Sequence, residues 1–224
     1  MYDILFSEVK SVKRSVYSLV LADDVIKAVD REAARRGTSR SNLINQILAA
    51  ELSCITPEMR MREIFGSLTD LVGSSFQIQQ QRSSSLMTLR TALDYKYRPT
   101  INYRVELDRS PEGYIGTLRV SIRTMNAKLT EMFENFFLYW SAMESEMLAG
   151  LGFKGNLSEI TPVTFVRKLL NTGLDDEHTA RAISEYLDNL NRAMQTYFAD
   201  PACLRDYSPW LEAQYKSMLE NYII

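Results

Sequence analysis

The 224-residue chain lacks the features that mark membrane, secreted and disulfide-linked proteins. No apolar run approaches the roughly 20 residues needed to span a bilayer, and no charged start followed by a long apolar stretch indicates a signal peptide. The two cysteines, Cys54 and Cys203, form neither a metal-binding nor a disulfide spacing. We therefore expect a cytoplasmic protein with free thiols and no membrane partner.

Signatures of catalysis and of cofactor binding are also missing. The chain has no glycine-rich phosphate loop and no recognisable nucleophile elbow. His178, in "LDDEHTARAI", is the sole histidine, so any histidine-based triad would have to use it. The acids beside it offer metal ligands, but a helix that Asp175 caps, and whose dipole the acids complement, explains them better. We predict no enzyme activity, no cofactor and no metal.

Charge is unevenly distributed along the chain, although the net charge is only −2. Between Lys10 and Ser41 there are eight lysines and arginines against four acids. A local basic excess matters more than the total charge when nucleic acid is the suspected partner. The N-terminal segment is therefore the first place to look for a DNA contact.

The same segment has the pattern of a strand followed by two helices. Residues 15–21, "SVYSLVL", read as a strand that is mostly apolar on both faces. Residues 22–37 form an amphipathic helix ended by Gly37, and Ser39 is a natural N-cap for a second helix over 38–52. So short a unit has too small a core to fold alone, which predicts a partner chain.

"RSVYSLVLADDVIKAVDREAARRGTSRSNLINQILAAEL" resembles the ribbon-helix-helix family of transcriptional regulators, the MetJ/Arc/CopG group. The resemblance covers roughly a quarter of the chain and needs no gaps. It implies that the strand pairs with its twin in a second subunit and that the two-stranded ribbon enters the major groove of DNA. A helix N-terminus, with its unpaired N–H groups, would hold a phosphate beside the groove.

The resemblance also implies a role for individual residues. The predicted DNA contacts are Lys13, Arg14, Val16, Ser18, Val20, Ser39, Arg40 and Ser41. The predicted dimer core is Tyr17, Leu19, Leu21, Val25, Val29, Ile44 and Ile47. The chain departs from the family at two places: valines stand where long polar side chains usually read bases, and Glu32 occupies a usual core position. A dimerisation module that never touches DNA is the alternative interpretation of this segment.

The rest of the chain predicts a second, larger domain. Helix patterns cover 56–73, 126–152, 161–172, 175–198 and 208–222, with a polar connection over 74–85. Between 86 and 123 apolar and polar residues alternate in three runs, which predicts an antiparallel meander with one wet face. The fold class is therefore α+β: a ribbon-helix-helix unit (1–54), a connecting helix and polar linker (55–82), and an α+β domain (83–224) whose three-stranded meander packs against helices.

Two features of the larger domain suggest binding surfaces. The wet face of the meander is rich in cations, namely Arg90, Lys96, Arg98, Arg104, Arg119 and Arg123, against Asp94 and Glu106. It is either a second nucleic-acid surface or an ordinary solvated sheet face, and the latter is commoner. The aromatic helix over 126–152 carries Phe133, Phe136, Phe137 and Trp140, which read as core; a pocket between this helix and the sheet is the natural place for an effector.

These patterns predict a dimeric, sequence-specific DNA-binding regulator that acts as a repressor. Double-stranded DNA and a second copy of the chain, as a homodimer or a higher oligomer, are the expected partners. The larger domain would govern oligomerisation or sense a protein or small-molecule effector. Two alternatives stay open: a protein-interaction module, such as an antitoxin or complex-assembly factor, and an RNA-binding accessory protein that uses the arginines of the sheet.

Overall fold

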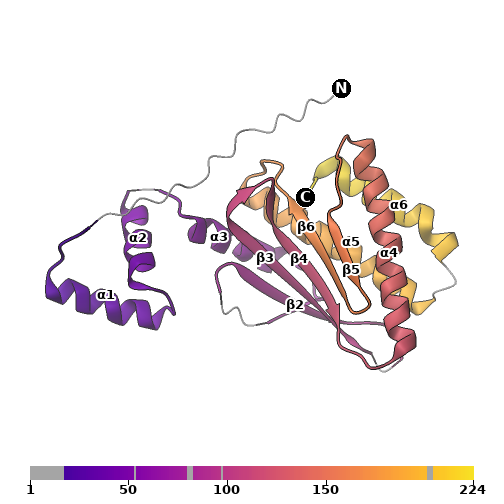
Figure 1. Cartoon of the computed structure of the whole chain (residues 1–224), viewed down its shortest axis with the longest axis horizontal. Coiled ribbons are helices and arrows are strands. Elements are labelled where there is room, and N and C mark those ends of the chain that lie inside the picture. The colour runs from indigo at the N-terminus through magenta and orange to yellow at the C-terminus, as the bar shows by residue number, and fades with distance from the viewer. Residues whose placement is uncertain (1–17, 53, 80–82, 97, 201–203) are drawn as a thin grey trace.

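The computed structural model describes residues 18–52, 54–79, 83–96, 98–200 and 204–224 (Figure 1). Its helices are α1 (Asp23–Arg35), α2 (Arg40–Glu51), α3 (Pro57–Leu71), α4 (Ala127–Gly150), α5 (Asp176–Ala199) and α6 (Leu204–Asn221). Its strands are β1 (Gln77–Ile78), β2 (Leu86–Ala92), β3 (Thr100–Glu112), β4 (Tyr114–Ile122), β5 (Ser158–Thr161) and β6 (Thr164–Leu170). All the predicted helices except the one over 161–172 are confirmed, with ends that differ by a few residues.

The strands form a single antiparallel sheet in the order β1-β2-β3-β4-β6-β5. The sheet is larger than the predicted three-stranded meander, because β1 adds to one side of β2–β3–β4 and the β5–β6 hairpin adds to the other. The protein is thus a mixed α/β chain with a six-stranded sheet.

The helix predicted over 161–172 is wrong, because this segment contains β6. Phe165, Arg167 and Leu169 alternate along β6 and are all buried. An arginine in the middle of the inward-facing row hides the period of two in the sequence. Pairing with β4, where Val120 lies opposite Phe165, decides the conformation in the folded chain.

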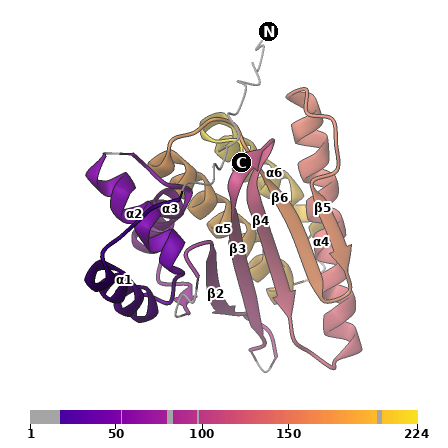
Figure 2. The same cartoon turned by 60° about the vertical axis from the view of Figure 1, so that its left-hand side comes forward.

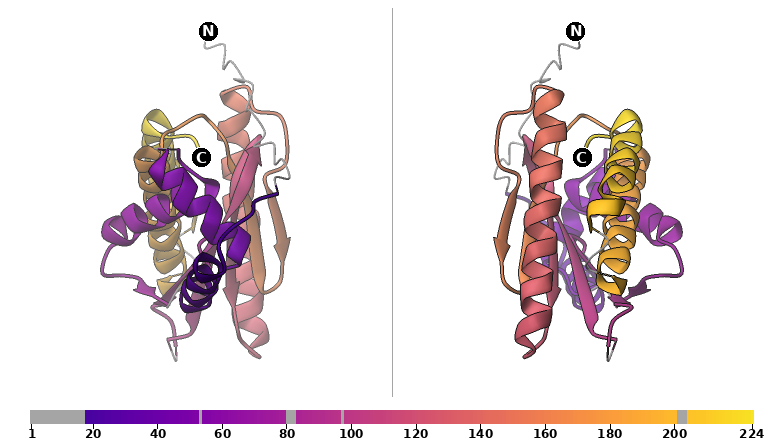
Figure 3. Two further views of the ribbon diagram at one scale, coloured as in Figure 1. Left: turned by 90° about the vertical axis from the view of Figure 1, so that its left-hand side faces the viewer. Right: turned by 90° about the vertical axis from the view of Figure 1, so that its right-hand side faces the viewer.

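One face of the sheet is packed against helices, which all lie on the same side of it (Figure 3). Ile101, Tyr103 and Val105 of β3 point to this side and are fully buried. Phe137 of α4 stacks on Phe165 of β6 with ring centroids 4.3 Å apart. The aromatic helix therefore covers the dry face, as the sequence predicts, and its aromatic side chains are core.

A buried polar cluster ties β6 to the three long helices. The Arg167 guanidinium Nε donates to Glu144 Oε1 of α4 at 2.7 Å, and Tyr215 of α6 donates its hydroxyl to the same oxygen at 2.6 Å. Arg167 also lies over the Tyr186 ring of α5, 4.4 Å from the centroid, and Trp140 Nε1 donates to the Tyr186 hydroxyl at 3.0 Å. Burial and the nearby Glu144 carboxylate raise the pKa of both tyrosines, which remain protonated donors.

Gly116 in β4 allows the β3 backbone to approach closely. A Cβ atom at this position would lie 2.0 Å from the Glu106 carbonyl oxygen. We expect Gly116→Ala to lower the free energy of unfolding by about 3 kcal/mol, because the strands must move apart. Urea denaturation measures this change. Gly66→Ala in α3 is the control, because nothing lies within 4 Å of a Cβ atom at that position. The control should raise the free energy of unfolding by about 0.5–1 kcal/mol, since alanine favours a helix more than glycine does. Equal effects of the two substitutions would contradict the close approach.

Helices α1 and α2 stand apart from the sheet and its helices, at the left of Figure 1 and again in Figure 2. Helix α3, in contrast, packs on α5, and its Met61, Ile64, Phe65 and Leu68 belong to the main core. Within the described part of the chain, no helix has both the length and the apolar composition needed to cross a membrane.

Candidate DNA-binding and dimerisation surface

The turn between α1 and α2 is built by local sequence signals. Gly37 follows α1 with φ +63°, a left-handed conformation that glycine adopts without a steric cost. Ser39 then caps α2, because its Oγ accepts a hydrogen bond from the Asn42 amide at 3.2 Å. The first helical bond runs from Leu43 N to Ser39 O, so the amides of Arg40 and Ser41 precede it and point out of the helix start.

Ion pairs organise the charges around this turn. Arg40 makes two hydrogen bonds of 2.6 Å to the Asp30 carboxylate, which joins the start of α2 to α1. Glu32, which departs from the family pattern, pairs with Arg35 and Arg36 of its own helix. Hydrogen bonds from these arginines, Arg35 first, lower the pKa of Glu32 to about 2. Glu32 is therefore ionised, and the two arginines of its own helix balance its charge.

An apolar surface lies uncovered on the N-terminal unit. Of the apolar stripe on α2, Leu43 is fully buried, whereas Ile47 and Leu48 are half exposed. Val25 at the start of α1 is 47% exposed, and the segment before it contributes Leu19 at 59% and Val20 at 103%. Leu52, at the end of α2, is also exposed. So many exposed large apolar side chains on one small unit are unusual for a surface that stays in water.

The predicted strand lies mostly outside the described residues. Of its seven positions, 15–17 are not described, and residues 18–21 have no strand pairing in the single chain. The strand prediction therefore fails for these four residues in the isolated chain. A lone strand has no hydrogen-bond partner for its backbone, and no other strand of the described chain pairs with these residues.

The predicted DNA contacts have different outcomes. Lys13, Arg14 and Val16 lie outside the described residues. Ser18 and Val20 are exposed. Ser39 is occupied as the helix cap, Arg40 is held by Asp30, and Ser41 is exposed in the first turn of α2. The structure thus brings Ser39, Arg40 and Ser41 together at the start of α2. The strand face predicted to contact bases, Val16, Ser18 and Val20, stays a prediction.

Six of the seven residues of the predicted dimer core are described by the structure. Tyr17 lies outside the described residues. Leu19, Val25 and Ile47 are exposed, and Leu21, Val29 and Ile44 are partly buried. Sequence reasoning missed the role of Asp30, whose carboxylate holds Arg40; ten residues separate the two, so no helix-face periodicity reveals the pair.

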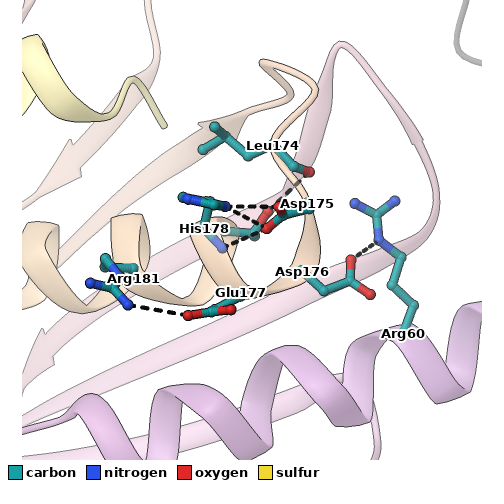
Figure 4. Close-up of polar contacts among 8 residues, drawn as sticks. Arg60, Leu174, Asp175, Asp176, Glu177, His178 and Arg181 are labelled. Atoms are coloured by element: carbon teal, nitrogen blue, oxygen red, sulfur yellow. Dashed lines mark hydrogen bonds and ion pairs between the residues drawn. The ribbon is translucent and has the colours of Figure 1, made fainter.

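Asp175, beside the sole histidine, is a helix cap, as the sequence predicts (Figure 4). Asp175 caps α5 by accepting from the His178 amide at 2.8 Å, and it also contacts the His178 ring Nδ1 at 2.8 Å. Asp176 instead pairs with Arg60 of α3 at 2.6 Å. Among the described residues, no group of three or more His, Cys, Asp or Glu side chains is placed to hold a metal ion.

A pocket of about 430 Å³ lies elsewhere than the expected effector site. It is formed by the start of α3, the β3–β4 hairpin and the start of α5, where Arg60 and Asp176 pair. Leu107 and Ile64 form part of its apolar wall. The interface between α4 and the sheet, which the sequence favours for an effector, is occupied by the packed aromatic rings of Phe136, Phe137 and Phe165.

Comparison with known proteins returned nothing. No protein-family model, no curated protein and no solved structure matches the chain.

Proposed function

We propose that this protein is a dimeric, sequence-specific DNA-binding transcriptional regulator that acts as a repressor in the cytoplasm. In this proposal residues 15–21 of two chains pair as a ribbon in the major groove, and α1 and α2 of each chain complete the dimer. The larger domain, from residue 83 onward, would modulate oligomerisation or respond to an effector.

The uncovered apolar surface of the N-terminal unit is the observation that carries this proposal. Leu19, Val25 and Ile47 would each lose contact with water if a second copy packed on the unit. Helices α1 and α2 share a small buried core in the single chain, with Leu43 fully buried and Ala33 and Ala49 nearly so. Such a core is too small to explain a stable unit, and a dimer supplies the missing burial.

The start of α2 supports a phosphate contact beside the ribbon. The amides of Arg40 and Ser41 offer donors at the positive end of the helix dipole. The Arg40–Asp30 pair is solvent-exposed on both sides, and exposed ion pairs contribute little to stability. A phosphate can therefore attract the Arg40 guanidinium, which moves from Asp30 at small cost.

We expect Lys13→Ala/Arg14→Ala/Arg40→Ala to weaken binding to duplex DNA at least tenfold, because about three phosphate contacts are lost. Fluorescence anisotropy over a range of salt concentrations measures this, and the slope of log K against log salt should become shallower by about 2.7. The matched control is Lys154→Ala/Arg192→Ala/Lys216→Ala, which removes three exposed cations of the larger domain. Wild-type affinity in the first variant at matched salt would show that the proposed surface is wrong.

A further inference from the structure

The sheet face opposite the helices carries a diagonal line of cations. The register aligns Thr88, Arg104, Arg119 and Val166 in one row across β2, β3, β4 and β6. Arg90 lies one row away on β2, beside Asn102, and Lys168 lies one row away on the other side, beside Thr117. Arg90, Arg104, Arg119 and Lys168, which we call the basic stripe, thus occupy four neighbouring strands in succession.

The stripe is continuous and exposed. All four side chains belong to exposed residues, and the sheet face that bears them has no helix in front of it in Figure 1. With strands about 4.8 Å apart and a rise of about 3.3 Å per residue, the stripe spans about 20 Å. Lys168 enters it only because residues 164–170 are a strand, so the helix predicted from the sequence concealed this member.

Positive charge on the stripe is poorly neutralised. Arg104 and Arg119 lie directly opposite each other on β3 and β4, an arrangement of like charges that destabilises a sheet. Arg104 has a 3.6 Å contact with Glu106, but both side chains are about half exposed, so the pair is weak. Arg119 makes no ion pair with any residue that the structure describes. Glu106 and Glu159 share this face but lie off the diagonal.

We propose that the basic stripe binds the phosphate backbone of duplex DNA, as a contact surface separate from the N-terminal ribbon. A line of four cations about 20 Å long complements a duplex in which each strand carries a negative charge about every 3.4 Å along the helix axis. Four neighbours of the stripe on this face are small and polar: Thr88, Asn102, Thr117 and Ser121. They supply hydrogen bonds to phosphate and sugar, and the Tyr114 ring beside the stripe is partly buried and in contact with Lys168 rather than free to stack on a base.

This inference goes beyond the proposed function, because it assigns DNA contacts to the larger domain and does not require the ribbon. It also gives a physical role to the facing arginines. An anion between them replaces repulsion with two charge-assisted contacts, so the cost of the arrangement in the free protein is recovered on binding.

The test uses the full-length chain and a labelled 30-base-pair duplex of random sequence in fluorescence anisotropy. We expect Arg104→Gln/Arg119→Gln to raise the dissociation constant at least tenfold at 0.1 M salt and to reduce the salt slope by about 1.8. The control, Lys154→Gln/Lys216→Gln, removes the same charge from exposed sites off the sheet and should change the constant less than twofold. Thermal denaturation checks the fold, and the stripe variant should melt no lower than wild type, since like charges are removed.

Several outcomes would overturn the proposal. One is an equal loss of affinity in the stripe variant and the control. Another is a stripe variant that loses binding to single-stranded RNA or to phosphatidylserine vesicles while its binding to duplex DNA is unchanged. The N-terminal triple variant separates this inference from the proposed function. If that variant binds DNA as wild type and the stripe variant does not, the ribbon proposal fails and the stripe stands; the reverse result refutes the stripe alone.

Discussion

Replacing Arg167 by methionine should lower the free energy of unfolding by about 3–5 kcal/mol, a large part of the 5–15 kcal/mol typical of a folded domain. Arg167 is fully buried and Glu144 is 3% exposed, so the substitution leaves a carboxylate in the core without its cation. The loss also removes the guanidinium from the Tyr186 ring. Chemical denaturation monitored by tryptophan fluorescence is suited to the measurement, because Trp140 lies in the same cluster.

Removing both charges should cost less than removing one. In Glu144→Leu/Arg167→Met neither charge of the pair remains, and the Tyr215 hydroxyl loses its acceptor, which costs about 1–3 kcal/mol. A double-mutant cycle from the two single variants and the double variant gives the coupling energy of the pair. Arg181→Met, which breaks the exposed pair with Glu177 on α5, is the control and should change stability by less than about 1 kcal/mol. An Arg167→Met effect as small as this would mean that the buried pair does not hold the helices on the sheet.

We expect Ile47→Glu to convert the proposed dimer to a monomer, with a dissociation constant at least about 100-fold higher. Ile47 is half exposed in the single chain and lies on the uncovered apolar surface, so a second copy would have to bury the new carboxylate. Burying an unpaired charge at an interface destabilises the complex, and the proposed dimer core contains no cation to pair with the new carboxylate. Sedimentation velocity at micromolar concentrations distinguishes the two species.

The control for the proposed dimer is Ala142→Glu, which adds the same charge to an exposed position of α4, outside the N-terminal unit. It should leave the sedimentation coefficient unchanged. A wild-type chain that sediments as a monomer, or an Ile47→Glu chain that stays dimeric, would exclude this surface as the dimer interface.

Local signals made several elements predictable. Ser39 and Asp175 are helix caps in the structure because a short polar side chain before an amphipathic run satisfies the first amides wherever the helix packs. The aromatic residues of α4 are core because their spacing places them on one face. Both properties depend on residues within a few positions of each other, which a sequence displays directly.

The strands at the far end of the sheet could not be predicted in the same way. Arg167 reads as a solvent-facing residue, yet Glu144, Tyr186 and Tyr215 from three different helices make its burial tolerable. Burial, the largest single cause, acts to lower the pKa of Arg167, but Glu144, Tyr186 and Tyr215 together raise it by more, so the guanidinium stays charged in the core. No local pattern announces partners that lie 23 and 48 residues away along the chain.

By itself the sequence determined the six described helices, their caps and the alternating strands between 86 and 122. The tertiary structure alone decided that six strands form the sheet, that β6 lies between β4 and β5, and that Arg104 and Arg119 face each other. The difference has a physical origin. Helix caps and periodicities arise from contacts within a turn or two, whereas strand order and cross-strand neighbours are set by packing between segments distant in the chain, where burial of the whole face outweighs the preference of any one segment.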